Sequence, residues 1–171
     1  MIWEQLNNDK QETSAGVIGF YEYSFLGIKK YKVLLTQNSK SLKWGFPKGH
    51  IEYRELCYQT AKREVFEETG QMVEKILPFT FESNYVLDGG VNKKVIYFLA
   101  TFSKKQKVNI SDPLISQAKF VSMDKVMNYL SFKQDKNNFK NTLDLLQKDK
   151  DLFKKEYKMK DLLQPWELNI E

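Results

Sequence analysis

The sequence predicts an α+β protein, an α/β/α sandwich in which a mixed β-sheet packs between helices. Three observations support this fold class. The chain has 171 residues, of which 42% are hydrophobic, and this suits one globular domain with a large buried core. Runs of β-forming residues interleave with helical runs, but without the strict rhythm of a fully parallel sheet. No internal repeat and no Gly/Ser/Pro-rich linker divides the sequence.

The first strands are predicted in the N-terminal third. Thr13–Phe25 and Tyr31–Thr36 are rich in β-forming residues, and residues 27–30 between them have the composition of a hairpin turn. A short aromatic strand is expected at Trp44–Lys48, where Pro47 marks its passage into a structured loop.

A helix and a second hairpin are predicted next. The helix covers Tyr53–Thr69, because this segment has no glycine or proline and Gly70 is the residue type that most often follows a helix. Two strands are predicted at Ile76–Tyr85 and Lys94–Phe102, and the sequence Asp88-Gly89-Gly90 favours a turn between them.

The C-terminal third is predicted to add one strand and two helices. Ala118–Met123 is a short strand, and Ser122 can cap a helix that runs through Tyr129. Apolar residues then recur at helical spacing, at Phe139, Leu143 and Leu146. We place one domain at residues 1–148. Residues 149–171, which include Trp166, form a C-terminal extension that suits either a docking helix or an interface.

The composition excludes several classes of protein. The single cysteine, Cys57, excludes an intramolecular disulfide and a cysteine-based zinc finger, and the single histidine, His50, excludes a histidine-rich metal site. No apolar run approaches the ~20 residues of a membrane-spanning helix, and the N-terminus lacks the order of a secretory signal. We therefore expect a cytoplasmic protein without a membrane partner, and a monomer by default.

The net charge of +5 comes almost entirely from lysine. Among 27 basic residues only Arg54 and Arg63 are arginines, and the segment from Lys133 to Lys160 has nine lysines against five acids. Lysine is a solvated point charge, whereas arginine is preferred for planar recognition of bases and phosphates. The charge fits either a lysine-rich solvated surface or attraction for a polyanionic ligand.

Three glutamates share one face of the helix predicted over residues 53–69. Glu64, Glu67 and Glu68 stand at i, i+3 and i+4, so a rotation of ~100° per residue keeps them within one arc. Like charges at this spacing destabilise a helix, and Arg63, which can pair with Glu67, neutralises only part of them. A divalent cation such as Mg²⁺ would compensate the repulsion. Taken alone, the triplet also fits a solvated acidic face.

Seven residues stand at a characteristic spacing along the sequence: Gly49, Glu55, Arg63, Glu64, Glu67, Glu68 and Gly70. This spacing resembles the signature of the Nudix hydrolases. That signature reads Gly, five residues, Glu, seven residues, Arg-Glu, an apolar residue, any residue, Glu-Glu, any residue, Gly and an apolar residue. The sequence departs only at Gln71, where an apolar residue is usual, and we expect this change to affect local packing more than chemistry. The resemblance implies the Nudix fold with its catalytic loop–helix–loop.

The same resemblance implies that Mg²⁺ or Mn²⁺ is bound and that water attacks phosphorus. Either Glu64 or Glu67 would orient the water, Glu55 would support the site near the helix start, and Arg63 would hold carboxylates in place. Glycine has no side chain, so the backbone of Gly49 would pass close to the metal ions. The implied catalytic residues are Glu55, Arg63, Glu64 and Glu67. The implied metal-binding residues are Gly49, Glu64, Glu67 and Glu68.

A second resemblance, over about residues 14–147, is to the asymmetrical diadenosine tetraphosphate hydrolases. It rests on Pro47-Lys48-Gly49-His50, Asn84-Tyr85-Val86, residues 94–100 and Phe132-Lys133. In that family a lysine contacts phosphate and two aromatic rings sandwich an adenine. The resemblance implies that Lys48 and His50 bind the phosphate chain, that Tyr85 and Phe132 stack on a purine, and that Tyr97 lines the same pocket. The three aromatic residues also suit plain core positions, and His50 also suits a loop-stabilising hydrogen bond.

One position departs from this second pattern. The family carries a glutamate a few residues before the strand at residues 119–121, where it serves as a metal ligand or base. This sequence has Leu114 there, and Asp112 is the nearest acid. Either Asp112 replaces the glutamate through a shifted loop, or the substrate differs.

The leading functional prediction is a metal-dependent pyrophosphohydrolase of dinucleoside polyphosphates, an asymmetrical bis(5′-nucleosyl)-tetraphosphatase that releases ATP and AMP from diadenosine tetraphosphate. One alternative is an RNA 5′-end pyrophosphohydrolase or mRNA decapping enzyme, which the basic C-terminal third would suit. Another is a diphosphoinositol polyphosphate hydrolase, because lysines suit dense phosphate. A Nudix-fold module that only binds its ligand is disfavoured, since all three glutamates of the helix are present.

Overall fold

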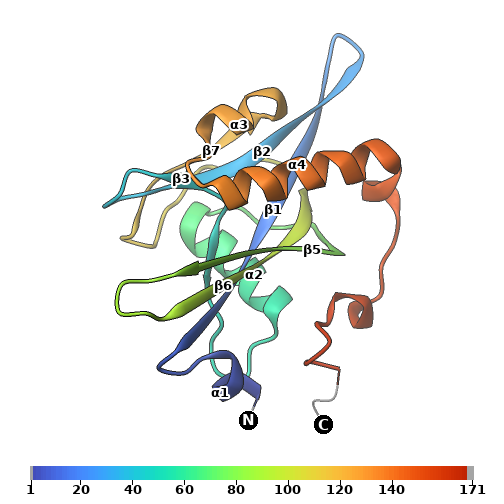
Figure 1. The fold of residues 1–171 in the computed structure, drawn as a ribbon. Coiled ribbons are helices and arrows are strands. Elements are labelled where there is room, and N and C mark those ends of the chain that lie inside the picture. The colour runs from blue at the N-terminus through green and yellow to red at the C-terminus, as the bar shows by residue number, and fades with distance from the viewer. Residues whose placement is uncertain (1, 169–171) are drawn as a thin grey trace.

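The computed structural model describes residues 2–168 as three layers, with a seven-stranded sheet between helices (Figure 1). The predicted α/β/α sandwich is confirmed. Among the described residues, no helix has the length and apolar character needed to span a bilayer. The strands are β1 (Gln11–Phe25), β2 (Ile28–Asn38), β3 (Trp44–Gly45), β4 (Lys48–His50), β5 (Lys75–Val86), β6 (Asn92–Phe102) and β7 (Ile115–Ser122). The α-helices are α1 (Ile2–Leu6), α2 (Cys57–Thr69), α3 (Val126–Tyr129) and α4 (Lys133–Lys148), and 3₁₀ turns cover Met123–Lys125, Leu152–Lys154 and Met159–Leu162.

The sheet is mixed, with the strand order β3-β2-β1-β6-β5 and with β4 and β7 paired to β1 and β2. β1 and β6 are parallel along Gln11–Tyr21, and the other described pairs are antiparallel. β1 changes partner along one edge, because residues 14–16 pair with β4 and residues 20–25 pair with β2. Where it changes, the Val17 N–H donates to the Pro47 carbonyl at 3.1 Å. The loop that leads to α2 is thereby fixed to the middle of the sheet.

Side chains that alternate along the strands divide the core between the two faces of the sheet. Ala15 and Val17 of β1 belong to the cluster on the α2 side, whereas Ile18 and Phe20 pack toward α3 and α4. Figure 1 shows α4 crossing one face of the sheet and α2 lying on the other. The sheet therefore has helices on both faces, as the interleaved strand and helix patterns predict.

Two predicted features near the N-terminus were placed wrongly. The hairpin turn expected at residues 27–30 lies at Leu26-Gly27, where both residues have positive φ, 50° and 75°. This geometry matches the twist of a two-residue hairpin. The strand expected at Trp44–Lys48 is interrupted between β3 and β4, because Pro47 has no N–H to donate to a ladder.

The helix predicted from Tyr53 begins only at Cys57. Arg54 has a φ of 65°, a left-handed conformation that an α-helix excludes, so the residues before Cys57 form a loop. Ser122 precedes the 3₁₀ turn that leads into α3, but its side chain makes no capping hydrogen bond. The predicted cap was therefore wrong, although α3 ends at Tyr129 as expected.

Segments near both ends of the chain hold the loop and the helix start. The Trp3 indole of α1 donates to the Ile51 carbonyl at 2.9 Å. A carboxylate oxygen of Glu167 accepts the N–H of Cys57, the first residue of α2, at 2.7 Å. Leu56, at the N-cap position, has no side-chain acceptor, so Glu167, 110 positions after Cys57, supplies the cap.

We expect Glu167→Ala to lower the free energy of unfolding by about 1 kcal/mol, the usual cost of losing a helix N-cap. The cause is a buried N–H at Cys57 left without its acceptor. The matched control is Glu156→Ala, which removes an exposed acid of the same C-terminal segment. Urea unfolding followed by circular dichroism measures both variants. Equal midpoints for the two variants would contradict the cap.

Candidate active site

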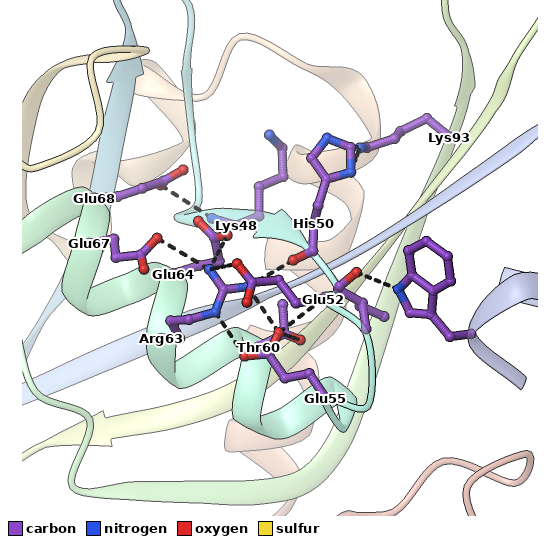
Figure 2. A network of polar contacts seen from close by, with 12 residues as sticks. Lys48, His50, Glu52, Glu55, Thr60, Arg63, Glu64, Glu67, Glu68 and Lys93 are labelled. Carbon is purple, nitrogen blue, oxygen red and sulfur yellow. Dashed lines mark hydrogen bonds and ion pairs between the residues drawn. The ribbon is translucent and has the colours of Figure 1, made fainter. Parts of the chain in front are cut away.

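Arg63 lies at the centre of a network of polar contacts between α2 and the loop before it (Figure 2). Its Nε and Nη2 atoms donate to the two carboxylate oxygens of Glu55 at 2.8 and 2.9 Å. Nη1 donates to Glu64 at 2.8 Å and to Glu67 at 3.2 Å, and Nη2 also donates to the His50 carbonyl at 2.9 Å. A guanidinium can hold these oxygens together because its five N–H groups lie in one plane. Arg63 therefore contacts the other three residues predicted to be catalytic, Glu55, Glu64 and Glu67.

Glu55 is kept ionised by its hydrogen-bond donors. Burial alone would raise the pKa of Glu55, but hydrogen bonds from Arg63 and from the Thr60 hydroxyl, the latter 2.6 Å long, lower it below its usual value. The backbone N–H of Glu52 donates to the same carboxylate at 3.1 Å. Glu55 thus ties its own non-helical loop to the first turns of α2, as expected for a supporting residue.

Glu64, Glu68 and Asp112 each bring a carboxylate oxygen to within 4.8 Å of the other two. Glu64 and Glu68 are 8% and 4% exposed. Burial raises the pKa of Glu64, against the opposing effect of Arg63, and burial raises the pKa of Glu68 to about 8. Buried carboxylates that lie this close together repel one another when ionised, and a bound cation would compensate their charge. Three oxygen ligands suit Mg²⁺. These side chains fit a divalent metal.

Asp112 reaches the cluster through the loop between β6 and β7. In this loop the Asn109 N–H donates to the Thr69 carbonyl at 3.1 Å, and the Ser111 N–H donates to the Glu67 carbonyl at 2.8 Å. Both carbonyls lie in the last turn of α2, where they have no acceptor role within the helix. The loop therefore docks on the end of α2 and carries Asp112 to the other carboxylates. Of the two alternatives left by the sequence, this geometry supports the shifted loop.

The two departures from the family patterns have local explanations. Leu114, where a glutamate is usual, is 48% exposed and lies outside the carboxylate cluster. Gln71 is fully buried. Its side-chain Nε2 donates to the Gln106 carbonyl at 2.9 Å, and its Oε1 accepts the Gln106 N–H at 2.8 Å. A polar side chain with satisfied hydrogen bonds thus replaces the usual apolar residue and anchors the same loop.

Close approach explains two of the motif glycines. A Cβ at Gly49 would lie 1.9 Å from the carboxyl carbon of Glu64, so only glycine lets β4 run beside this carboxylate. Gly70 follows α2 with a φ of 74°, and a Cβ there would lie 2.8 Å from the backbone nitrogen of Asn109. Both glycines therefore keep space for groups that build the site.

Glu67 stands apart from the carboxylate cluster. Its side chain is 46% exposed and forms an ion pair with Arg63 at 3.2 Å. The structure brings together two of the three glutamates predicted as metal ligands, with Asp112 as the third acid. A role for Glu67 in metal binding or in orienting water stays a prediction.

A cavity of about 430 Å³ lies beside the cluster. Tyr85 and Phe132 in its wall are 40% and 46% exposed, whereas Tyr97 is buried. Glu68 belongs to both the cavity and the carboxylate cluster, and it accepts the backbone N–H of Lys48 at 3.3 Å. Lys48 also lines the cavity, so four of the five predicted substrate-binding residues meet there.

His50, the fifth predicted substrate-binding residue, is not among the residues that line this cavity. Its imidazole lies 3.3 Å from the Lys93 ammonium and 3.9 Å from a Glu12 carboxylate oxygen. Burial and the charge of Lys93 lower the pKa of His50. Its predicted contact with phosphate stays a prediction.

The residues of the cavity wall that sequence reasoning missed include Lys43 and Asp135. The Lys43 ammonium lies 5.3 Å from the centre of the Phe132 ring. Asp135 is buried in the first turn of α4. An acid three residues after Phe132 is a weak signal for Asp135, and no local pattern indicates Lys43.

The fold and the site together define a class of α/β/α protein in which a loop–helix–loop presents carboxylates beside a ligand cavity. The model of the NUDIX domain matches residues 25–143, which is more than half of the chain. The chain therefore belongs to the Nudix family.

Three solved structures illustrate the likeness in fold. An Ap4A hydrolase from C. elegans, in a binary complex, has a TM-score of 0.69 at 23% identity, over 80% of this chain and 98% of that one. The NUDIX domain of Shewanella oneidensis NrtR, complexed with ADP ribose, has a TM-score of 0.64 at 22% identity, over 84% and 96%. A MutT protein from Bacillus halodurans has a TM-score of 0.58 at 23% identity, over 77% and 82%. At these identities the likeness establishes the fold.

We expect Asp112→Asn to weaken the binding of Mn²⁺ by at least about tenfold. Substitutions of groups that only orient metal ligands typically lower metal affinity about 10- to 100-fold. Loss of the negative charge of a ligand should lower it at least as much. Asp124→Asn, at an exposed acid of the 3₁₀ turn after β7, is the matched control. Titration of Mn²⁺ by electron paramagnetic resonance measures both variants. An affinity unchanged from wild type in Asp112→Asn would contradict the cluster.

Proposed function

We propose that this protein is a metal-dependent hydrolase of dinucleoside polyphosphates, which cleaves diadenosine tetraphosphate to ATP and AMP. The observation that carries the proposal is the continuity between the carboxylate cluster and the aromatic cavity through Glu68 and Lys48. A ligand that extends from the aromatic cavity to the carboxylate cluster would place a flat base in the cavity and a phosphate chain beside the cluster. The C. elegans protein of similar fold is named for this class of substrate.

Glu64, Glu68 and Asp112 would hold the cation. When bound, a divalent cation neutralises phosphate oxygens and lowers the pKa of coordinated water. Lys48 binds the phosphate chain where the cavity meets Glu68. Either Glu64 or Glu67 orients the water that attacks phosphorus, and Glu67 is the more accessible of the two to solvent.

The supporting residues fix the positions of these groups. Hydrogen bonds to Glu55 and Glu64 raise the pKa of Arg63, so its guanidinium keeps its charge throughout the reaction. Through this charge Arg63 orients Glu64 and Glu67 without contacting phosphate. Tyr85 and Phe132 receive the adenine, since both rings are partly exposed in the cavity wall.

The lysines around the cavity suit a polyphosphate more than a single phosphate. Lys43, Lys48 and Lys133 all contribute to its wall. The same charges would suit an RNA 5′ end or an inositol pyrophosphate, but an inositol ring offers no π-face for Tyr85 and Phe132. The aromatic cavity therefore favours a nucleotide substrate.

A panel assay tests the proposal. With Mg²⁺ we expect faster hydrolysis of diadenosine tetraphosphate than of capped RNA, 5′-triphosphate RNA or a diphosphoinositol polyphosphate, and no activity in EDTA. Preference for either RNA substrate or full activity in EDTA would refute the proposal.

Glu67→Gln should lower kcat at least ~100-fold, as loss of a water-orienting group implies, while Glu74→Gln, at an exposed acid just after α2, should not. Near-normal turnover of Glu67→Gln would exclude Glu67 as the water-orienting residue and leave Glu64.

The aromatic clamp has its own test. Replacing Tyr85 or Phe132 with alanine removes a stacking face and should raise KM for diadenosine tetraphosphate by roughly 5- to 150-fold, the value of one base stack. Because stacking stabilises ground and transition states alike, kcat should fall much less. Phe25→Ala, at an exposed ring of the β1–β2 hairpin, is the control. An unchanged KM in both variants would exclude the clamp.

A further inference from the structure

The buried carboxyl of Asp135 lies in the wall of the aromatic cavity and outside the carboxylate cluster. Its exposed fraction is 4%. The Ser83 hydroxyl donates to its Oδ1 atom at 3.2 Å, and Ser83 and Tyr97 both line the same cavity. Among the ion pairs of the described residues, none includes Asp135. A buried acid without a paired cation costs stability unless another group uses its acceptor oxygens.

Burial raises the pKa of Asp135 to about 6, against the opposing effects of Ser83, Lys48 and Tyr97. At neutral pH the carboxyl is therefore mostly ionised within a largely apolar cavity. An ionised acceptor in such a setting forms strong hydrogen bonds with ligand N–H groups. The same carboxyl, when protonated, still keeps one acceptor oxygen.

The surroundings leave this carboxyl open to the cavity. Gly45 of β3 lies next to the carboxyl of Asp135. A Cβ at Gly45 would lie 3.1 Å from Oδ2 of Asp135, so glycine leaves space beside this oxygen. Gly45 and Asp135 both line the cavity, as do the partly exposed rings of Tyr85 and Phe132. A base stacked on either ring therefore enters a space whose wall contains a hydrogen-bond acceptor for the edge of the base.

We propose that Asp135 is a specificity-determining residue, which accepts a hydrogen bond from the exocyclic amino group of adenine in this cavity. The inference rests on the proposed function, which places a nucleotide there. Adenine carries an amino group where hypoxanthine carries a carbonyl oxygen. Hypoxanthine would set its oxygen against the carboxylate and leave a buried acceptor without a donor, which is costly.

The test is direct binding of AMP and IMP, measured by isothermal titration calorimetry with wild type and Asp135→Asn. Wild type should bind AMP at least about tenfold more tightly than IMP, the value of a hydrogen bond to a charged group. The asparagine amide can accept from adenine and donate to hypoxanthine, so the preference should largely disappear in Asp135→Asn. Asp144→Asn, at an exposed acid on α4, should keep it.

Several outcomes would overturn the inference. Equal affinities in wild type would do so without any variant, and so would a preference that survives Asp135→Asn. If Asp135 had a purely structural role, Asp135→Asn would weaken the binding of AMP and IMP alike and leave the ratio of the two affinities unchanged. Failure to hydrolyse diadenosine tetraphosphate, with the AMP preference intact and lost in Asp135→Asn, would refute the proposed function and leave this inference standing. Absence of binding of both nucleotides would overturn this inference, while the panel assay would still decide the proposed function.

Discussion

The pairing of Arg63 with Glu55 is the interaction on which the candidate active site depends. The loop before α2 is not helical, and Arg63 ties it to the helix through both oxygens of Glu55 and through the His50 carbonyl. The same guanidinium orients Glu64. A planar group with fixed donors can satisfy all these acceptors, whereas a lysine ammonium could offer only a point charge. One arginine therefore sets both the position of the loop and the direction of a carboxylate.

This local arrangement rests on segments remote in sequence. Trp3 holds the loop at the Ile51 carbonyl, and Glu167 caps the first turn of α2. Because a helix N-terminus has unsatisfied N–H groups, a buried start at Cys57 requires such an acceptor. The C-terminal extension is thus packed against the helix that carries Glu64, and the position of that helix depends on residues beyond the segment matched by the family model.

The part of the site that lies on one loop and one helix was predictable from spacing. Helical periodicity alone places Glu64 and Glu68 on one face. The start of α2 was not predictable, because the helical pattern continues back to Tyr53 while tertiary contacts of the loop impose another backbone conformation. Asp112 and Asp135 come from other segments, brought in by a loop docked on the end of α2 and by the packing of α4. No spacing rule relates residues that meet only through such packing.

The proposed substrate has two identical ends, whereas the described residues present one aromatic cavity beside the carboxylate cluster. In the proposed function, whichever nucleoside enters that cavity would be held by Tyr85 and Phe132, and the phosphate chain would then lead past Lys48 toward Glu68. The fixed separation between these rings and the carboxylates would determine which phosphorus atom meets the attacking water. If that separation matches an outer bridging oxygen and not the central one, a symmetrical molecule bound at a single end would be cut off-centre, and the unequal products ATP and AMP would follow.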